Sequence, residues 1–281
     1  MRKYLDVNDT ISEIRLLRRH PGSNYFIIVL VEGDDDIKLF RKLINGSLVR
    51  IEQPSGGCGS LEIVLNEIGQ ETDKIIGIRD ADFLNLLDGH NSRNDLFYTD
   101  YHDMEMTMIN NDPTFYAITC EHCSESYDHY KTLRHSVLMA LQFLSGIRLI
   151  NHIDDIGLYL RSFPIGDHLN PSTLEFDKNG CVEKVHMRSK NKKREITVAE
   201  VDEICANNYD LYDFTCGHDF KKALAIHMKK LSGTQIGVDS IGCSLRTAFS
   251  LNEFKKTTLF CDLNMWENNS NNKLFQTADH L

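Results

Sequence analysis

The chain has 281 residues, of which 41% are hydrophobic and 26% charged, and its formal net charge is −10. This length and apolar content suit one large or two modest soluble domains. The negative charge excludes a general electrostatic attraction to nucleic acid, so phosphate binding would have to be local or mediated by a metal. No apolar run approaches the ~20 residues of a membrane span, and the N-terminus lacks the apolar segment of a signal peptide. We therefore expect a cytoplasmic protein without membrane contact, and its eight irregularly spaced cysteines are typical of reduced thiols.

The first part of the chain alternates between helix and strand patterns. In chain order, the patterns predict a helix capped by Asn8 or Asp9 and ending at His20, a strand over 25–31, a helix over 37–44, a strand over 47–54, a helix over 61–68 and a strand over 74–78. This alternation is typical of an α/β fold with a parallel sheet.

Acidic side chains follow two of the predicted strands. The stretch VEGDDD places Glu32 directly after the first strand, and Asp80 and Asp82 follow the third. Because the carboxyl ends of neighbouring parallel strands lie side by side, these carboxylates are expected to converge. Converging carboxylates repel one another, and a hard cation such as Mg²⁺ relieves the repulsion. We predict a metal site, the alternative being that the acids only begin a helix and cap a loop.

The same residues carry a family resemblance. The order strand, Glu32-Gly33, helix, strand, glycine turn, helix, strand and Asp80-x-Asp82 resembles the Toprim domain over residues 24–110. VEGDDDIKLFRKLI is similar to the version in OLD-like antiphage effectors, such as the Toprim subunit of the PARIS defence system. The resemblance implies a Rossmann-like sheet with one or two Mg²⁺ ions, or Mn²⁺ in their place. In OLD-type enzymes a second acid follows the glutamate by four residues, and Asp36 has that position.

Two further acids stand at the start of the next predicted helix. In YTDYHDMEMTMI, residues 98–109, a strand pattern turns into a helix pattern at Asp103 and Glu105. Acids are stabilised at a helix N-terminus by the helix dipole alone, so capping is one interpretation. The other is a metal ligand, because relatives carry an acidic motif near the metal after the Asp-x-Asp strand. The resemblance favours Glu105 over Asp103 as that ligand.

We expect residues 1–115 to form the Toprim domain and residues 116–281 a mostly helical α+β accessory region. That region begins with a core helix over 130–150, and residues 174–189 are predicted to form a hairpin that turns at 178–180. The basic segment RSKNKKR follows, and it is either a solvated loop or a nucleic-acid contact made by Arg188, Lys190, Lys192, Lys193 and Arg194.

A second basic element begins at Gly217-His218-Asp219. The amphipathic helix that follows carries Lys221 and Lys222, so its start could hold an anion, while the simpler interpretation is a capped helix with a lysine-rich solvent face. A Gly-His-Asp element recurs late in relatives. His218 is therefore a candidate to donate a proton to a leaving oxygen or to orient a ligand.

Two other patterns are weak. Cys120 and Cys123 have the spacing of half a zinc site, but no second half follows. The glycine-rich turn at 55–60 lacks the Lys-Ser/Thr pair of a P-loop, so we do not expect ATP hydrolysis by this chain.

The combined expectation is a metal-dependent endonuclease. Its expected catalytic residues are Glu32, Asp80, Asp82 and His218. Asp36 and Glu105 are further metal ligands, and Lys221 and Lys222 are further nucleic-acid contacts. The resemblance implies an effector that an ABC-type ATPase partner holds inactive, with RNA, particularly tRNA, favoured over DNA. It also allows a homodimer in the active state. The alternatives are a catalytically silent Toprim-like module that binds nucleic acid or a partner, and a small-molecule phosphotransferase.

Overall fold

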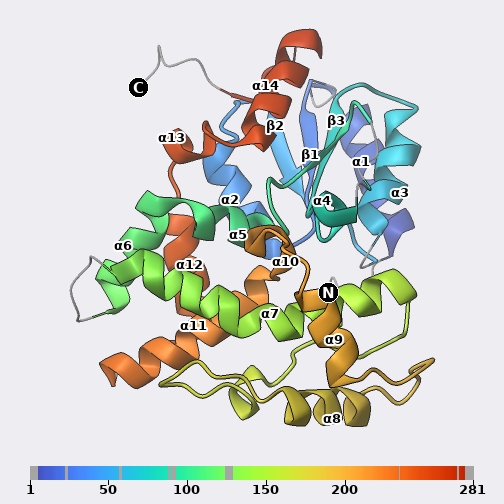
Figure 1. The fold of residues 1–281 in the computed structure, drawn as a ribbon. Helices are drawn as coiled ribbons and strands as arrows, with labels where there is room; N and C mark the ends of the chain where they lie inside the picture. Colours follow the sequence, from blue (N-terminus) through green and yellow to red (C-terminus); the bar gives the residue numbers. More distant parts are fainter. Residues whose placement is uncertain are drawn as a thin grey trace. The chain divides into compact units, whose positions relative to one another are not determined.

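The structure is a computed structural model that describes residues 6–22, 25–56, 59–87, 89, 93–123, 129–233, 235–270 and 272–275. The chain forms two compact units. In Figure 1 the colours follow the sequence, so the residues of each unit can be located by the colour bar. Unit 1 comprises Met1–Ala81, Asn91–Asp100 and Ser250–Leu281, and unit 2 comprises Asp82–His90 and Tyr101–Phe249. Unit 1 thus includes the end of the chain, which the predicted division at residue 115 assigned to the accessory region.

Unit 1 is built on a four-stranded parallel sheet with the strand order β2-β1-β3-β4. The strands are β1 (Ile27–Leu30), β2 (Val49–Glu52), β3 (Ile75–Arg79) and β4 (Leu96–Tyr98). Every residue of β1 is buried, as expected for a strand inside a sheet that is covered on both faces. The predicted α/β class is confirmed, and the fold is consistent with a Rossmann-like arrangement.

Helices cover both faces of this sheet. The helices of unit 1 are α1 (Val7–Arg19), α2 (Asp34–Leu43), α3 (Ser60–Gly69), α13 (Leu251–Phe254) and α14 (Thr258–Ser270). Ile28 and Leu30 of β1 pack with the apolar residues of α1 and α3, while α2 covers the opposite face (Figure 1). The cap of α1 is Asp6, whose Oδ1 accepts hydrogen bonds from the backbone of Asn8 and Asp9, so the predicted cap at Asn8 or Asp9 was wrong by two or three positions.

Hydrogen bonds tie the described residues after Ser250 to the rest of unit 1. The carboxylate of Asp100 accepts from the first amides of α14, Thr258 N at 2.8 Å and Leu259 N at 2.9 Å. Gly46 N donates to Leu274 O at 2.8 Å, and a side chain at Gly46 would meet that carbonyl. These contacts explain why residues after Ser250 belong to unit 1.

Unit 2 is helical. Its helices are α4 (Leu84–Leu87), α5 (Met104–Asn110), α6 (Asp112–His122), α7 (Tyr130–Asp154), the 3₁₀ helix η3 (Ile165–Asp167), α8 (Lys178–Arg188), α9 (Val198–Cys205), α10 (Leu211–Phe214), α11 (Gly217–Ser232) and α12 (Val238–Ala248). The predicted core helix is confirmed as α7, which packs against α6, α9, α10 and α11. Among the described residues, α7 alone is long and apolar enough to cross a membrane. Because 56% of its most apolar window is buried, it resembles the core helix of a soluble protein.

The hairpin predicted over residues 174–189 is wrong. Residues 178–188 form helix α8, and Asp177 caps it by accepting a hydrogen bond from Gly180 N at 3.0 Å. The Asn179-Gly180 pair, which suggested a hairpin turn, lies in the first turn of this helix. The apolar residues Cys181, Val182 and Val185 then fall at helical spacing and are buried. Phe176 instead forms an isolated antiparallel bridge with Leu169.

Candidate functional site

The carboxyl ends of β1 and β3 bring two of the predicted acids to one edge of the sheet. The strands are neighbours, with Leu30 opposite Gly77. Glu32 follows the end of β1 by two residues, and Asp80 follows β3 directly. Both residues therefore lie at the edge where parallel sheets place their ligand-binding crevices.

Within unit 1, Arg79 is the basic partner of Glu32. Its Nε lies 3.3 Å from Glu32 Oε1, and its guanidinium also forms an ion pair with Glu62. These three side chains line a pocket of about 210 Å³ together with Val31, Pro54, Gly59 and Leu61. Arg79 thus supplies positive charge to Glu32.

Asp36 has a local structural role. Its Oδ2 accepts a hydrogen bond from Gly33 N at 2.9 Å and so completes the cap at the start of α2. Asp34 and Asp35 occupy the same first turn, where the helix dipole stabilises negative charge. The interpretation of these acids as a helix start is therefore correct, and a metal-binding role for Asp36 stays a prediction.

Asp82 belongs to unit 2, whereas Asp80 belongs to unit 1. The backbone of Asp82 has a φ of 49°, in the left-handed region, and its N–H donates to His102 O at 2.7 Å. Its Oδ1 lies 3.9 Å from His102 Nε2. His102, which directly precedes Asp103, therefore orients Asp82.

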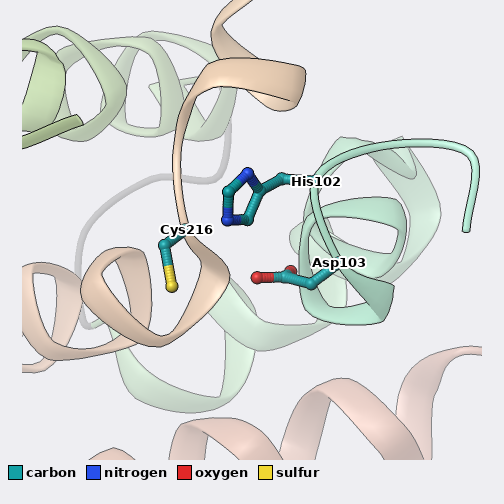
Figure 2. Close-up of side chains that lie close together, drawn as sticks. All are labelled: His102, Asp103 and Cys216. Carbon is teal, nitrogen blue, oxygen red and sulfur yellow. The ribbon is translucent and has the colours of Figure 1, made fainter. Parts of the chain in front are cut away.

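The predicted acids and the predicted histidine of unit 2 meet in one place, at the N-terminal ends of α5 and α11. The N-terminal end of α5 contributes His102, Asp103 and Glu105, and the N-terminal end of α11 contributes Cys216, His218 and Lys221. We call these six residues the α5–α11 cluster. Two groups within it have ligand atoms that all lie within 4.8 Å of one another, namely His102, Asp103 and Cys216, and Asp103, Glu105 and His218. Figure 2 shows that the side chains of the first group converge.

Asp103 joins the two helices. As the cap of α5 it accepts a hydrogen bond from Met106 N at 2.8 Å, and its other oxygen accepts from Gly217 N at 2.6 Å. A side chain at Gly217 would overlap Asp103 and would meet Glu105 Cβ at 2.5 Å. The glycine of Gly-His-Asp is therefore required for the close approach of α11 to Asp103.

Glu105 is held by a lysine and lies near His218. Lys221 Nζ is 2.5 Å from Glu105 Oε1, and His218 Nδ1 is 3.9 Å from the same oxygen. Burial opposes ionisation of Glu105, but Lys221 and His218 outweigh it and lower the pKa of this carboxyl. Lys221 is itself buried, so the lysine-rich solvent face was wrong for this residue. Lys222 lies on the same turn, with its Nζ 3.9 Å from Asp219 Oδ1.

His102, Cys216 and Asp103 shift one another's pKa values. Burial acts to lower the pKa of His102, but a hydrogen bond with Cys216 and the charge of Asp103 raise it to about 9. Burial acts to raise the pKa of Cys216, but hydrogen bonds from His102 and His218 lower it to about 6. Burial and the charge of Glu105 raise the pKa of Asp103 to about 7. The hydrogen bond with Cys216 raises the pKa of His218 to about 9, against the effect of burial.

Sequence reasoning missed His102 and Cys216. His102 precedes Asp103 directly, and Cys216 precedes Gly217-His218-Asp219 directly, so each adjoins a motif that the sequence had marked. The available signal was their chemistry, because histidine and cysteine next to two candidate ligand motifs are themselves common metal ligands.

The basic segment is largely paired with acids of its own unit. Lys192 Nζ lies 3.6 Å from Glu195, Lys193 Nζ lies 2.6 Å from Asp155, and Arg194 contacts Asp154 at 2.5 Å and Glu200 at 2.6 Å. Arg188 donates to Arg161 O at 2.7 Å, and Lys190 is exposed. This arrangement favours the solvated-loop interpretation for Lys192, Lys193 and Arg194, while nucleic-acid binding by Arg188 and Lys190 stays a prediction.

The chain thus carries two sets of candidate ligands with different chemistry. Glu32, Asp80 and Asp82 offer oxygen ligands, whereas the α5–α11 cluster adds sulfur and nitrogen. Among the described residues, Cys120 and Cys123 belong to no group close enough to share an ion. A comparison with models of known protein families and with curated proteins finds no match for this chain.

Proposed function

We propose that the chain is a Mg²⁺-dependent endonuclease that hydrolyses phosphodiester bonds. The observation that carries the proposal is the parallel register of β1 and β3, since it supports Glu32 and Asp80 as ligands at one edge of the sheet. Asp82, two residues after Asp80, would complete the ligand set. The resemblance of these elements to the Toprim domain supports the same function.

In this mechanism the protein contributes ligands and a proton donor. Glu32, Asp80 and Asp82 would hold one or two Mg²⁺ or Mn²⁺ ions, which supply an activated water and stabilise charge on the phosphate. Asp36 and Glu105 are the further candidate ligands. His218 is exposed and carries a raised pKa of about 9, so it is protonated at neutral pH and suited to donate a proton to a leaving oxygen.

The substrate and the partner follow from the resemblance. The proposed substrate is RNA, particularly tRNA, ahead of DNA, and Arg188, Lys190 and Lys222 are the candidate strand contacts. The proposed setting is the cytoplasm of a cell that uses the nuclease as an antiphage effector. An ABC-type ATPase partner would keep it inactive until infection, and a homodimer is the proposed active form.

The Glu32–Arg79 ion pair favours a second candidate function. An arginine beside the principal carboxylate reduces the need for a metal, because it already neutralises that charge. A catalytically silent module that binds nucleic acid or a partner would retain such a pair. The two candidates predict different effects of Mg²⁺. In the nuclease, Mg²⁺ would replace Arg79 as the partner of Glu32, whereas in the silent module the Glu32–Arg79 ion pair would remain.

A cleavage assay tests the proposal. The full chain is incubated with bulk tRNA, other cellular RNA, and single- and double-stranded DNA, with Mg²⁺, with Mn²⁺ or with chelator. We expect strand cleavage that requires the metal and is fastest on RNA. Release of inorganic phosphate without cleavage would indicate the phosphotransferase instead. Binding without cleavage under every condition would establish the silent module.

A further inference from the structure

The α5–α11 cluster contains a ligand set that the proposed nuclease does not use. His102, Asp103 and Cys216 lie outside the proposed set of Mg²⁺ ligands, and their ligand atoms lie within 4.8 Å of one another. They come from two segments far apart in the chain that meet at two helix starts (Figure 2). The set combines an imidazole, a carboxylate and a thiol, which is the donor chemistry of zinc and related transition metals.

His102 is oriented as a metal ligand. Its Nδ1 lies 3.2 Å from Asp213 O, and a backbone carbonyl can only accept, so this nitrogen carries the proton. In the hydrogen bond with Cys216, Nε2 also carries a proton, and metal binding would release this proton and leave the lone pair on Nε2. The ring is also fixed by Phe83, which packs against it edge-on at a centroid distance of 4.8 Å. A carbonyl that fixes the tautomer is the usual outer partner of a histidine that binds a metal.

Cys216 is placed so that its thiolate is favoured. It is the cap residue of α11, a helix of 16 residues, and the positive end of the helix dipole stabilises negative charge there. The thiolate is the form of cysteine that binds metals.

The remaining charges of the cluster leave room for a cation. Lys221 pairs with Glu105, and Arg148 Nε pairs with Asp219 at 2.6 Å. Among the described residues, Asp103 has no ion pair with a lysine or an arginine. In addition, Asp219 Oδ1 is buried and accepts no hydrogen bond from a described residue. Lys222 Nζ lies 3.9 Å from this oxygen, so among the described residues Asp103 is the acid of this group that has neither a lysine nor an arginine as a partner.

We propose that unit 2 binds a divalent transition-metal ion, Zn²⁺ foremost, through His102 Nε2, the Asp103 carboxylate and Cys216 Sγ. Binding would draw these atoms to about 2.0–2.3 Å from the ion. Three protein ligands leave a fourth position open, as in catalytic zinc sites. Mg²⁺ is not expected here, since it requires oxygen ligands. The inference does not depend on the proposed nuclease function.

Cobalt substitution tests the site directly. Purified full-length protein is stripped with chelator and titrated with Co²⁺ and, separately, with Zn²⁺ in the presence of excess Mg²⁺. We expect a single ion per chain, a thiolate-to-cobalt charge-transfer band, loss of that band when Zn²⁺ is added, and no displacement by Mg²⁺. No charge-transfer band in the wild-type protein would overturn the proposal.

Two ligand variants and one control make the test specific. Cys216→Ser keeps a residue that caps helices well, and His102→Asn keeps a donor toward Asp213 O, so both variants are expected to fold. Each should weaken Zn²⁺ binding by at least about tenfold, the lower limit known for changes to the partners of metal ligands. Cys243→Ser removes an exposed thiol of the same unit and should bind as the wild type does. Equal binding by Cys216→Ser and Cys243→Ser would overturn the proposal.

Discussion

Asp80 and Asp82 are the residues at which activity and stability are expected to separate. If they are metal ligands, their carboxylates repel neighbouring carboxylates when the metal is removed, and a bound metal ion relieves this repulsion and stabilises the protein. As loop caps or ion-pair partners they would contribute about 1 kcal/mol to stability with or without metal.

We predict that Asp80→Asn and Asp82→Asn each abolish cleavage but leave the melting temperature in chelator unchanged or higher. Added Mg²⁺ should raise the melting temperature of the wild type more than that of either variant, because a ligand stabilises in proportion to its binding. Thermal melts with chelator and with Mg²⁺ measure both effects. Equal gains in all three proteins would place the metal elsewhere.

Asp112 gives unit 2 a predictable response to acid. Its carboxylate contacts Arg134 at 2.6 Å and Lys131 at 2.9 Å, and Arg134 is buried between α5, α6 and α7. Burial opposes ionisation of Asp112, but the hydrogen bonds from Lys131 and Arg134 lower its pKa below the usual value of an aspartate. The folded state therefore favours the ionised form.

The resulting stability is present above the unfolded-state pKa and is lost as the pH falls through the folded-state pKa. Asp112→Asn should lower the free energy of unfolding at neutral pH and should flatten its decrease below pH about 4. Urea unfolding at a series of pH values measures this. If the stability of Asp112→Asn fell with decreasing pH as steeply as that of the wild type, the contacts of Asp112 with Arg134 and Lys131 would not contribute to stability.

At the scale of elements, the contact between α5 and α11 depends on Gly217. A Cβ at this position would overlap the Asp103 carboxylate and the Glu105 side chain, which are fixed by their own hydrogen bonds. We predict that Gly217→Ala destabilises the protein by about 1–3 kcal/mol, as overpacking does, and weakens Zn²⁺ binding. Denaturant unfolding measures the first effect and cobalt titration the second.

Gly166→Ala is a suitable control in the same unit, because its Cβ would meet only the flexible end of Ile226 at 3.4 Å. Gly166→Ala should change neither the free energy of unfolding nor Zn²⁺ binding appreciably. If Gly217→Ala behaved like Gly166→Ala, α11 would not need to approach Asp103 closely.

The sequence predicted elements well where one local pattern dominated. The strands of unit 1 are short apolar runs between turn signals, and their alternation with helices indicated a parallel sheet, although the order of the strands in that sheet was not predicted. Residues 178–188 were mistaken for a hairpin because Asn-Gly favours turns, whereas the cap by Asp177 and the spacing of Cys181, Val182 and Val185 determine a helix.

At the scale of the whole molecule, what the sequence could not predict is non-local. The hydrogen bond from Gly46 to Leu274 returns the end of the chain to unit 1, and no periodicity encodes it. Likewise, His102 and Cys216 become neighbours only through the packing of α5 on α11. Glu105 and His218 were identified as candidates because each stood in a motif, although their proximity was not foreseen.

The basic segment provides a test at the same scale, because the chain as a whole carries a net charge of −10. Lys192, Lys193 and Arg194 already pair with acids, so their replacement by Ser should leave the salt dependence of nucleic-acid binding nearly unchanged. Binding isotherms at several salt concentrations measure the slope. A clearly flatter slope in the variant would restore the segment as a phosphate contact.

Cleavage by two matched glutamate variants tests the central claim most directly. Glu32 and Glu62 both form ion pairs with Arg79, and their side chains are 34% and 32% exposed, so Glu32→Gln and Glu62→Gln each remove one similarly exposed carboxylate from the same arginine. Only Glu32 is a proposed metal ligand. We predict Mg²⁺-dependent RNA cleavage by the wild type and by Glu62→Gln, and none by Glu32→Gln. Cleavage by Glu32→Gln with an unchanged Mg²⁺ requirement would contradict the account.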